Sequence, residues 1–265
     1  MTLVTALYNI RRETEGDGRT FQEYLDWFKD TLKLKSPMVV FVEEDLKDYV
    51  LEHRKELPTK IITQPIEEIP YYYLNDEIQS ILEDENFLNK IGAPERLECK
   101  MSMYNVVIYS KFKWMEKAIK EDYFNSDYFL WVDAGLSRFF YRVDLEKEYP
   151  SKETQEKLIK NKDKLLIQTT MNFYPDLINA EKTNEDYFWD ARTWIMAGCW
   201  GGGKEILNKY IEDIEDILIN KMLKNKIINN EQNAMAYHFK NNKNMYAVFE
   251  NRTWDQPYEI ANRLI

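Results

Sequence analysis

The sequence Asp127-Tyr-Phe-Leu-Trp-Val-Asp133-Ala-Gly135-Leu-Ser-Arg138 runs from an apolar segment into a carboxylate and then a glycine. The five residues from Tyr128 to Val132 predict a buried strand. Asp133 follows that strand directly, and the chain turns at Gly135. Parallel α/β sheets present ligand-binding groups at the carboxyl ends of their strands. We therefore expect an α/β domain in which Asp133 stands at the edge of a ligand site.

Segments with strand character alternate with helical patterns along the whole chain. The predicted strands are Thr2–Tyr8, Met38–Val42, Lys60–Thr63, Tyr128–Val132, Leu165–Thr170, Trp194–Ala197 and Met245–Phe249. Among the predicted helices, one begins at the capping box Thr20-x-x-Glu23, and another covers Ser102 to Lys120 with one apolar face. This alternation predicts a single α/β domain with a central, mostly parallel sheet flanked by helices.

Composition and charge limit the classes of function. The 265 residues carry a formal net charge of -10, which argues against a nucleic-acid-binding protein because such proteins are usually basic. An acidic protein can still hold a nucleoside diphosphate in a local basic pocket. With 18 Tyr, 13 Phe and 7 Trp the aromatic content is high, and core packing is favoured over sugar stacking as its main cause.

Two further features bear on the compartment. Cys99 and Cys199 are the only cysteines, so the chain has no disulfide framework, which is typical of a reducing compartment. We find no targeting signal, and no apolar run approaches the length of a membrane span. We expect a cytoplasmic protein without a transmembrane segment.

Asp133 has two interpretations that the residue pattern alone does not separate. At the end of a strand its carboxylate is suited to hold Mn²⁺ or Mg²⁺, which would neutralise a diphosphate. An aspartate ahead of a glycine is also a common turn former. Gly135, which lets a phosphate approach the backbone, and Arg138, one turn further on, favour the ligand site.

The segment Ala197-Gly-Cys-Trp-Gly-Gly-Gly203 holds four of the eight glycines. Consecutive glycines have no Cβ atoms and allow positive φ angles, so a ligand can lie against the main chain. We expect a ligand-facing loop after a strand at Trp194–Ala197, with a merely flexible turn as the alternative. The segment matches neither the dinucleotide motif nor the Walker loop.

Glu231 begins a predicted helix in which it would act as a general base or bind a sugar hydroxyl. The alternative is simple electrostatics, because helix N-termini favour acids. Neither His53 nor His238 belongs to a metal-spaced cluster or a catalytic triad. Basic residues such as Arg11, Arg12, Lys111 and Arg252 would either meet phosphates or only balance the acidic charge.

Four segments in matching order resemble the HtrL/YibB (WlaTC/HtrL) family of glycosyltransferases. They are Thr2-Leu-Val-Thr-Ala-Leu-Tyr-Asn-Ile-Arg-Arg12, Pro37-Met-Val-Val-Phe-Val-Glu43, Ser110-Lys-Phe-Lys-Trp114 and Trp131-Val-Asp-Ala-Gly-Leu-Ser-Arg138. The likeness extends from residue 2 to about residue 250. Its specificity lies in the set of four, not in any one of them.

The resemblance implies a GT-A-like, Rossmann-like fold in one domain, residues 1–265. Residues 1–140 would form the nucleotide-sugar-binding half and residues 141–265 the acceptor-side half. The implied reaction moves a sugar from a nucleotide sugar, with a UDP-sugar as first choice, to a hydroxyl of a glycan or glycoconjugate.

The same resemblance implies roles for particular residues. Asp133 would be the first acid of a D-x-D motif, and Glu231 the base or the anchor of a hydroxyl. On the donor side the implied set is Thr5, Ala6, Tyr8, Arg11, Glu43, Lys111, Asp133, Ala134 and Gly135. On the acceptor side it is Gly198, Trp200, Gly201, Gly202, Glu231 and Gln232. Because Gly135 stands where the motif has its second acid, Mn²⁺ or Mg²⁺ would be held by Asp133, the diphosphate and a distal residue such as His238.

Two other functions stay open. A nucleotidyltransferase that makes a nucleotide sugar would share the parallel sheet and its strand-end acids. Such enzymes usually place a glycine-rich phosphate loop after the first strand, and Asn9 to Arg12 contain no glycine. A non-catalytic nucleotide- or glycan-binding protein on a degenerate transferase fold would agree with the missing acid at Gly135.

Overall fold

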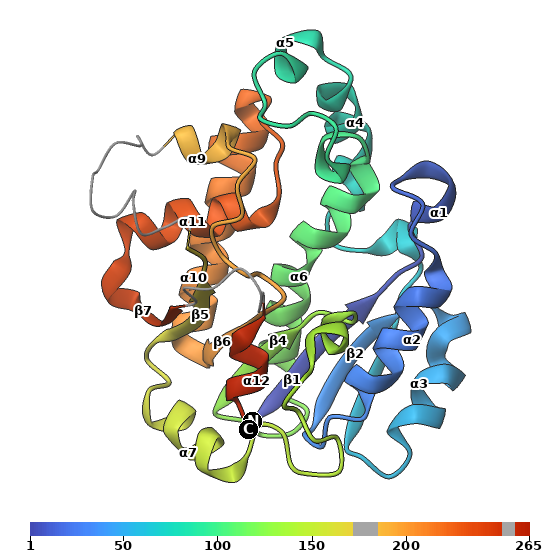
Figure 1. The fold of residues 1–265 in the computed structure, drawn as a ribbon, viewed down its shortest axis with the longest axis vertical. Helices are drawn as coiled ribbons and strands as arrows, with labels where there is room; N and C mark the ends of the chain where they lie inside the picture. Colours follow the sequence, from blue (N-terminus) through green and yellow to red (C-terminus); the bar gives the residue numbers. More distant parts are fainter. Residues whose placement is uncertain (172–184, 251–257) are drawn as a thin grey trace.

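A computed structural model describes residues 1–171, 185–250 and 258–265. At its centre lies one seven-stranded sheet in the order β3-β2-β1-β4-β6-β5-β7 (Figure 1). The strands are β1 (Thr2–Leu7), β2 (Met38–Val42), β3 (Thr59–Thr63), β4 (Tyr128–Val132), β5 (Leu165–Thr169), β6 (Cys199–Gly203) and β7 (Tyr246–Glu250). Strand β6 runs antiparallel to both of its neighbours, and the other pairs are parallel. The prediction of a mostly parallel sheet is confirmed.

Helices cover both faces of this sheet, which explains why β2 and β4 are apolar and buried at every position. The helices are α1 (Arg12–Glu15), α2 (Phe21–Leu32), α3 (Lys47–Arg54), α4 (Asn75–Leu82), α5 (Glu85–Leu88), α6 (Ser102–Glu121), α7 (Lys152–Lys160), α9 (Asp186–Trp189), α10 (Lys204–Asp216), α11 (Glu231–Asn241) and α12 (Glu259–Arg263). Helices α6, α10 and α11 pack on one face, and α2, α3 and α12 on the other.

The helix starts follow the local sequence. Thr20 and Glu23 form the predicted capping box at the start of α2, where the Thr20 hydroxyl accepts from the Glu23 backbone N–H. Helix α6 begins at Ser102, as expected, and buries its apolar face. After α10 the chain continues as a π-helix over Ile217–Met222.

The order of the strands creates a switch point between β1 and β4. From β1 the chain moves outward through β2 to β3, and then returns to place β4 on the opposite side of β1. The connections that leave the two central strands therefore separate at their carboxyl ends. Open α/β sheets bind ligands in the crevice at such a point.

The glycine segment is a strand and not the loop that the sequence predicted. The strand expected at Trp194–Ala197 is displaced to β6, where Gly201 and Gly203 are buried. A Cβ atom on Gly201 would lie 2.4 Å from the Phe129 carbonyl oxygen, and one on Gly203 would lie 2.6 Å from that of Lys162. These glycines therefore allow close packing of the backbone around β6.

The short helix α12 was not predicted from the sequence. Its buried Asn262 accepts hydrogen bonds from the backbone N–H groups of Tyr141 and Arg142 and donates one to the Phe139 carbonyl. Helix α12 thus anchors the segment that follows Arg138. In the described part of the chain no helix has both the length and the apolar character needed to cross a membrane. Cys99 and Cys199 are both buried and unpaired.

Candidate functional site

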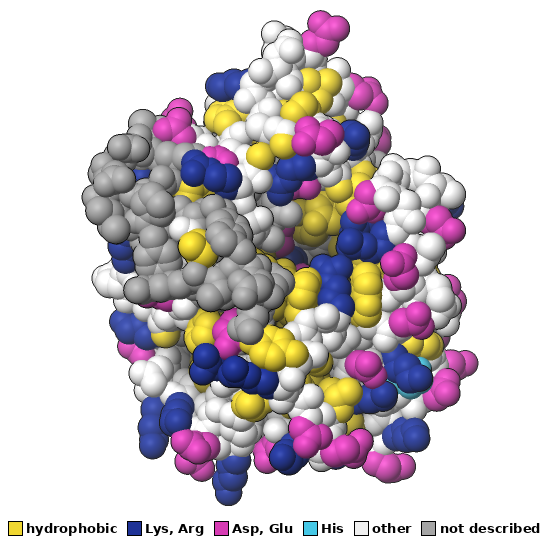
Figure 2. Space-filling model, in the orientation of Figure 1, with side chains coloured by type: hydrophobic (Ala, Val, Ile, Leu, Met, Phe, Trp, Pro, Cys, Tyr) yellow, Lys and Arg dark blue, Asp and Glu magenta, His cyan; other side chains and the backbone are white. Residues whose placement is uncertain are grey.

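A cavity of about 290 Å³ lies at the switch point, at the carboxyl ends of β1 and β4. Residues 6–10 and 133–136 line it from the strand ends, and α2, α6 and the start of α11 contribute side chains. Figure 2 shows a hollow in this face of the molecule, bordered by apolar and basic side chains. The cavity therefore occupies the place where the sheet topology predicts a ligand.

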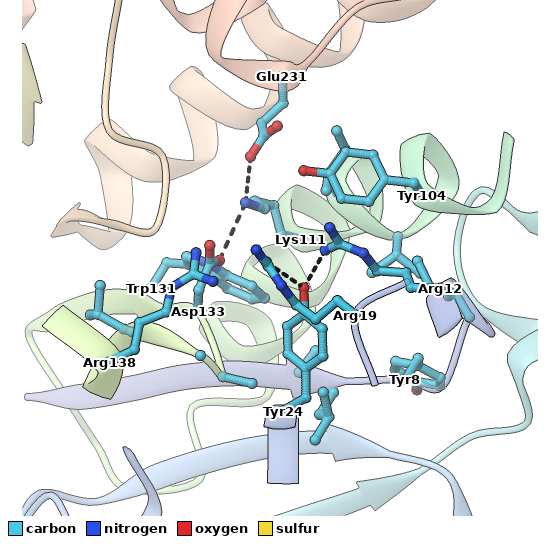
Figure 3. Close-up of a pocket in the computed structure, with 18 of the residues that line it drawn as sticks. Tyr8, Arg12, Arg19, Tyr24, Tyr104, Lys111, Trp131, Asp133, Arg138 and Glu231 are labelled. Atoms are coloured by element: carbon cyan, nitrogen blue, oxygen red, sulfur yellow. Dashed lines mark hydrogen bonds and ion pairs between the residues drawn. The ribbon is translucent and has the colours of Figure 1, made fainter. Parts of the chain in front are cut away.

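Lys111 lies between two carboxylates in this cavity (Figure 3). Its Nζ donates to Glu231 Oε1 at 2.5 Å and lies 3.3 Å from Asp133 Oδ1. Trp131 Nε1 donates a second hydrogen bond, of 2.6 Å, to the same Asp133 oxygen. Because Lys111 belongs to α6, Asp133 follows β4 and Glu231 begins α11, the cluster joins three elements distant in sequence.

Burial controls the protonation of this cluster. The side chains of Lys111 and Glu231 are 5% and 3% exposed, whereas that of Asp133 is 39% exposed. Burial raises the pKa of Glu231, and the attraction of Lys111 offsets this rise only in part. Burial alone would lower the pKa of Lys111, but the two carboxylates outweigh it and raise that pKa, so the amine stays charged.

Glu231 has one oxygen free for chemistry. Its Oε1 accepts from Lys111, while its buried Oε2 has no hydrogen-bond partner in the described part of the chain. An unsatisfied buried carboxylate oxygen is costly, and such atoms are concentrated at functional sites. The free Oε2 and the raised pKa together suit Glu231 to accept a proton from a ligand hydroxyl.

Two arginines share the hydroxyl of one tyrosine on α2. Tyr24 accepts a hydrogen bond from Arg12 Nη1 and another, at 3.4 Å, from Arg19 Nη1. Arg12 is also fixed by a 2.6 Å ion pair with Asp17. The ring of Tyr24 thus holds both guanidinium groups at the border of the cavity, as Figure 3 shows.

A third arginine, Arg138, completes the basic border of the cavity. The Cζ atoms of Arg138 and Arg19 lie 4.9 Å and 5.6 Å from the ring centroid of Trp27. Within residues 1–171, 185–250 and 258–265, neither guanidinium forms an ion pair with a carboxylate. Among the described residues of the lining, four basic side chains stand against two carboxylates, and one surplus positive charge remains once Arg12 is counted with its partner Asp17, although the whole chain is acidic.

A ladder of stacked rings lies behind this charged surface. Tyr8 stacks on Trp114 at 5.2 Å between centroids, Trp114 on Trp131 at 6.4 Å, and Trp131 on Trp200 at 6.4 Å. All four rings are at least 95% buried. They act first as core, as the composition indicated, and through Trp131 they also fix the orientation of Asp133.

Eight of the predicted site residues meet in the cavity. They are Ala6, Tyr8, Lys111, Asp133, Ala134, Gly135, Glu231 and Gln232. These residues come from both halves of the chain. The cavity therefore includes Asp133, at the end of β4, together with Glu231, at the start of α11. The two acids thus lie in the same cavity, whereas the glycines of 198–203 do not line it.

Three residues predicted on the donor side do not line the cavity. Thr5 is fully buried within β1. Arg11 is exposed and lies 3.7 Å from Glu15. Glu43 is half-buried at the end of β2, where it accepts from the Asn9 backbone, and burial with the nearby Asp45 raises its pKa.

The predicted acceptor-side glycines also lie outside the cavity lining. Trp200, Gly201 and Gly202 are buried within β6, because this segment forms a central strand in place of a loop. Gly198 is closer to the site, since its carbonyl accepts the Asp133 backbone N–H at 2.9 Å. A Cβ atom on Gly198 would lie 3.0 Å from Asp133 Oδ2. Gly198 therefore supports the position of that carboxylate.

His238 does not join Asp133. It is buried on α11, where its Nδ1 lies 2.5 Å from the Tyr246 hydroxyl and its Nε2 lies 3.0 Å from Asp213 Oδ2. Burial lowers its pKa, and Asp213 opposes this shift. Both ring nitrogens are engaged with protein groups, so the predicted role as a metal ligand is not compatible with this arrangement.

Several residues of the cavity were not selected from the sequence. They are Asn9, Arg19, Tyr24, Tyr104, Asn230 and Tyr258, among others. Arg19 and Tyr24 flank the capping box of α2, and Asn230 is the N-cap of α11. These local motifs mark helix starts, but nothing in the sequence indicates that both starts face one cavity.

The cavity is a poor fit to a divalent metal ion. Asp133 Oδ1 already accepts from Trp131 and pairs with Lys111, and Glu231 Oε1 accepts from the same ammonium. Gly135 contributes no side-chain ligand atom. In the described ranges no group of three or more His, Cys, Asp or Glu side chains is placed to hold a metal. The ammonium of Lys111 thus occupies the space between the carboxylates.

Comparison with known proteins identifies relatives of this chain. A family model described as "Bacterial protein of unknown function (HtrL_YibB)" matches residues 1–260. "Protein HtrL" of Escherichia coli (strain K12) is 28% identical over 145 residues, which cover 51% of this chain and 50% of that protein. The match therefore spans half the length of the curated relative. Mouse xyloside xylosyltransferase 1, in its apo form, superposes with a TM-score of 0.43 and 11% identity, over 99% of this chain and 91% of that one.

Proposed function

Because the chain belongs to the HtrL_YibB family, whose description assigns no function, we propose one from the cavity: transfer of a sugar from a nucleotide sugar to a hydroxyl group. The acceptor would be a glycan or glycoconjugate, and a UDP-sugar is the first donor to test. The observation that carries the proposal is the Asp133–Lys111–Glu231 cluster within a positively charged cavity at the switch point of the sheet.

The positive surplus supports an anionic ligand. Arg12, Arg19, Lys111 and Arg138 all line the cavity of a protein whose net charge is -10. Basic groups in a concave site focus the potential there, so an anion is attracted to the cavity despite the acidic surface. A nucleoside diphosphate sugar is an anion, and the faces of its rings can pack against the apolar walls of the cavity.

Glu231 would act on the acceptor. As a base, its Oε2 takes the proton of the acceptor hydroxyl while that oxygen forms a bond to the anomeric carbon. The bond from this carbon to the diphosphate oxygen breaks, and the electron pair leaves with the diphosphate. Lys111 would keep Glu231 in place through Oε1, which leaves Oε2 to accept the proton.

The first experiment is a thermal-shift screen of UDP, GDP, CMP, dTDP and their sugars, followed by an assay for released nucleoside diphosphate. One nucleotide class should raise the melting temperature. Glu231→Gln should keep that shift and reduce release by about 10²–10⁴-fold, because the base is lost while the shape is kept. Glu205→Gln, an exposed change of the same kind on α10, is the matched control.

Three outcomes would reject the proposal. If no nucleotide or nucleotide sugar raised the melting temperature, a nucleotide sugar would be rejected as the donor. Release of pyrophosphate from a nucleoside triphosphate and a sugar phosphate would identify a nucleotidyltransferase. Binding without release, with every acceptor tried, would favour a binding protein.

A further inference from the structure

We infer that Lys111, Arg19 and Arg138 hold the diphosphate of the donor in the role usually given to a divalent metal, so that binding of the donor does not require one. This inference rests on the proposed function and specifies how the same site would stabilise its leaving group. It departs from the expectation that Asp133 holds Mn²⁺ or Mg²⁺.

The carboxylates of the cavity are already engaged by a cation. Among the described lining residues the acids are Asp133 and Glu231, and the Lys111 ammonium contacts both. A metal ion bound to Asp133 would lie next to this ammonium, and the repulsion between the two positive charges opposes binding. Lys111 is buried with Glu231, so it cannot move away without leaving the buried charge of that carboxylate uncompensated.

The arginines of the cavity differ in whether a carboxylate compensates their charge. Arg12 forms an ion pair with Asp17. In contrast, no carboxylate in the described part of the chain pairs with Arg19 or Arg138, and both guanidinium groups lie within cation–π distance of the Trp27 ring. Contact with an aromatic ring positions a guanidinium without consuming its N–H donors, which can then bind phosphate oxygens. In the described part of the chain, the two arginines are therefore positioned cations whose charge no carboxylate neutralises.

Gly135, which stands where a D-x-D motif has its second acid, lies next to Trp27, the ring that both arginines contact. A Cβ atom at Gly135 would lie 3.3 Å from Trp27 Cε3, which is tighter than ordinary contact. The second acid of a D-x-D motif would stand at this position and press against the ring that supports Arg19 and Arg138. Compared with an acid at this position, glycine at 135 therefore omits one metal ligand. It also leaves room for the Trp27 ring that Arg19 and Arg138 contact.

The charges balance during the transfer. When the bond between the anomeric carbon and the diphosphate oxygen breaks, the oxygen keeps the electron pair and gains negative charge. N–H groups of Lys111, Arg19 and Arg138 donate to the phosphate oxygens and stabilise this charge. The proton of the acceptor goes to Glu231 Oε2, and no oxidant or further reactant is needed.

The test measures binding of UDP, GDP and inorganic pyrophosphate by calorimetry, in EDTA and in Mn²⁺. We expect the same affinity within about twofold in both conditions. Arg19→Gln and Arg138→Gln should each weaken binding by about tenfold or more, because each loses a charged hydrogen-bond donor. Arg11→Gln, which removes an exposed arginine outside the cavity, should leave the affinity unchanged. Arg138→Lys keeps the charge and should give an intermediate loss.

The outcomes separate this inference from the proposed function. Nucleotide binding that is lost in EDTA and restored by Mn²⁺ would overturn the inference and leave the transferase proposal in place. Unchanged affinity in both glutamine variants, with melting temperatures equal to that of the unmodified protein, would also overturn it. Binding of pyrophosphate without binding of any nucleotide would support the anion site and reject the proposed function.

Discussion

At the scale of single residues, the cavity depends on one buried lysine. Lys111 has two carboxylate partners and side-chain exposure of 5%, so its charge is compensated by protein groups and not by water. Burying an ion pair gains little stability, because desolvation offsets the attraction. Removing one partner is far more costly, since it leaves a buried charge alone.

Lys111→Met should therefore lower the free energy of unfolding by about 3–5 kcal/mol. Urea denaturation measures this change, and Lys117→Met, an exposed substitution on the same helix, is the control. The double variant with Glu231→Gln should recover part of the loss, because both buried charges are then removed. A double variant no more stable than Lys111→Met would contradict the coupling between the two side chains.

The raised pKa of Glu231 predicts a dependence on pH. A carboxyl whose pKa is higher in the folded state than its unfolded value of 4.5 stabilises the fold below that value. This contribution is lost as the pH rises through the folded pKa. Glu231→Gln does not titrate, so its stability relative to the unmodified protein should increase between about pH 4 and pH 7. A decrease, measured by urea denaturation across that range, would mean that Lys111 lowers this pKa.

At the scale of elements, the glycines of β6 are explained by packing and not by a ligand. Strand β6 runs antiparallel between β4 and β5, and its backbone passes close to that of β4. Gly201 would meet a carbonyl oxygen of β4, whereas the nearest atom to a Cβ on Gly202 is a side-chain atom, Ile206 Cγ2, at 2.9 Å. The two positions should differ in their tolerance of a methyl group.

Gly201→Ala should destabilise the protein by about 1–3 kcal/mol or more, because the backbone of β4 must shift. Gly202→Ala should cost less, since its nearest contact is longer and involves a side-chain atom of Ile206 in place of a backbone oxygen. Thermal or urea denaturation of the two variants compares them directly. Equal stability of Gly201→Ala and the unmodified protein would show that the segment is not a packed strand.

At the scale of the whole molecule, helix α12 connects the C-terminal residues with the border of the cavity. Asn262 is fully buried and bonds to the backbone at residues 139, 141 and 142, directly after Arg138. Tyr149 donates to the Ala261 carbonyl, which adds a second buried link. The orientation of Arg138 thus depends on residues more than a hundred positions later in the chain.

Asn262→Ala should lower the free energy of unfolding by about 1–3 kcal/mol, because buried backbone groups lose their partners. It should also weaken pyrophosphate binding, through the altered position of Arg138. Asn220→Ala, at an exposed site, should change stability by less than about 0.5 kcal/mol. A loss of stability without any change in pyrophosphate binding would show that α12 does not influence the cavity.

The sequence by itself determined the local features of this protein. Apolar runs predicted six of the seven strands with small errors in their ends, and the capping box marked α2. Asp133 and Glu231 were recognisable because a strand end and a helix start are set by neighbouring residues. The same reasoning misplaced β6, because glycine has no side chain whose pattern could report its burial.

Only the tertiary structure decided which groups Asp133 and Glu231 contact. Lys111 and Glu231 are 120 positions apart, and their contact depends on how α6 and α11 pack. The platform of Trp27, Arg19 and Arg138 likewise requires α2 to lie against the turn after β4. Such contacts follow from the packing of elements distant in sequence, and local periodicity carries no information about them. The sequence therefore indicated an acid at a sheet edge, and the fold placed an ammonium where a metal was expected.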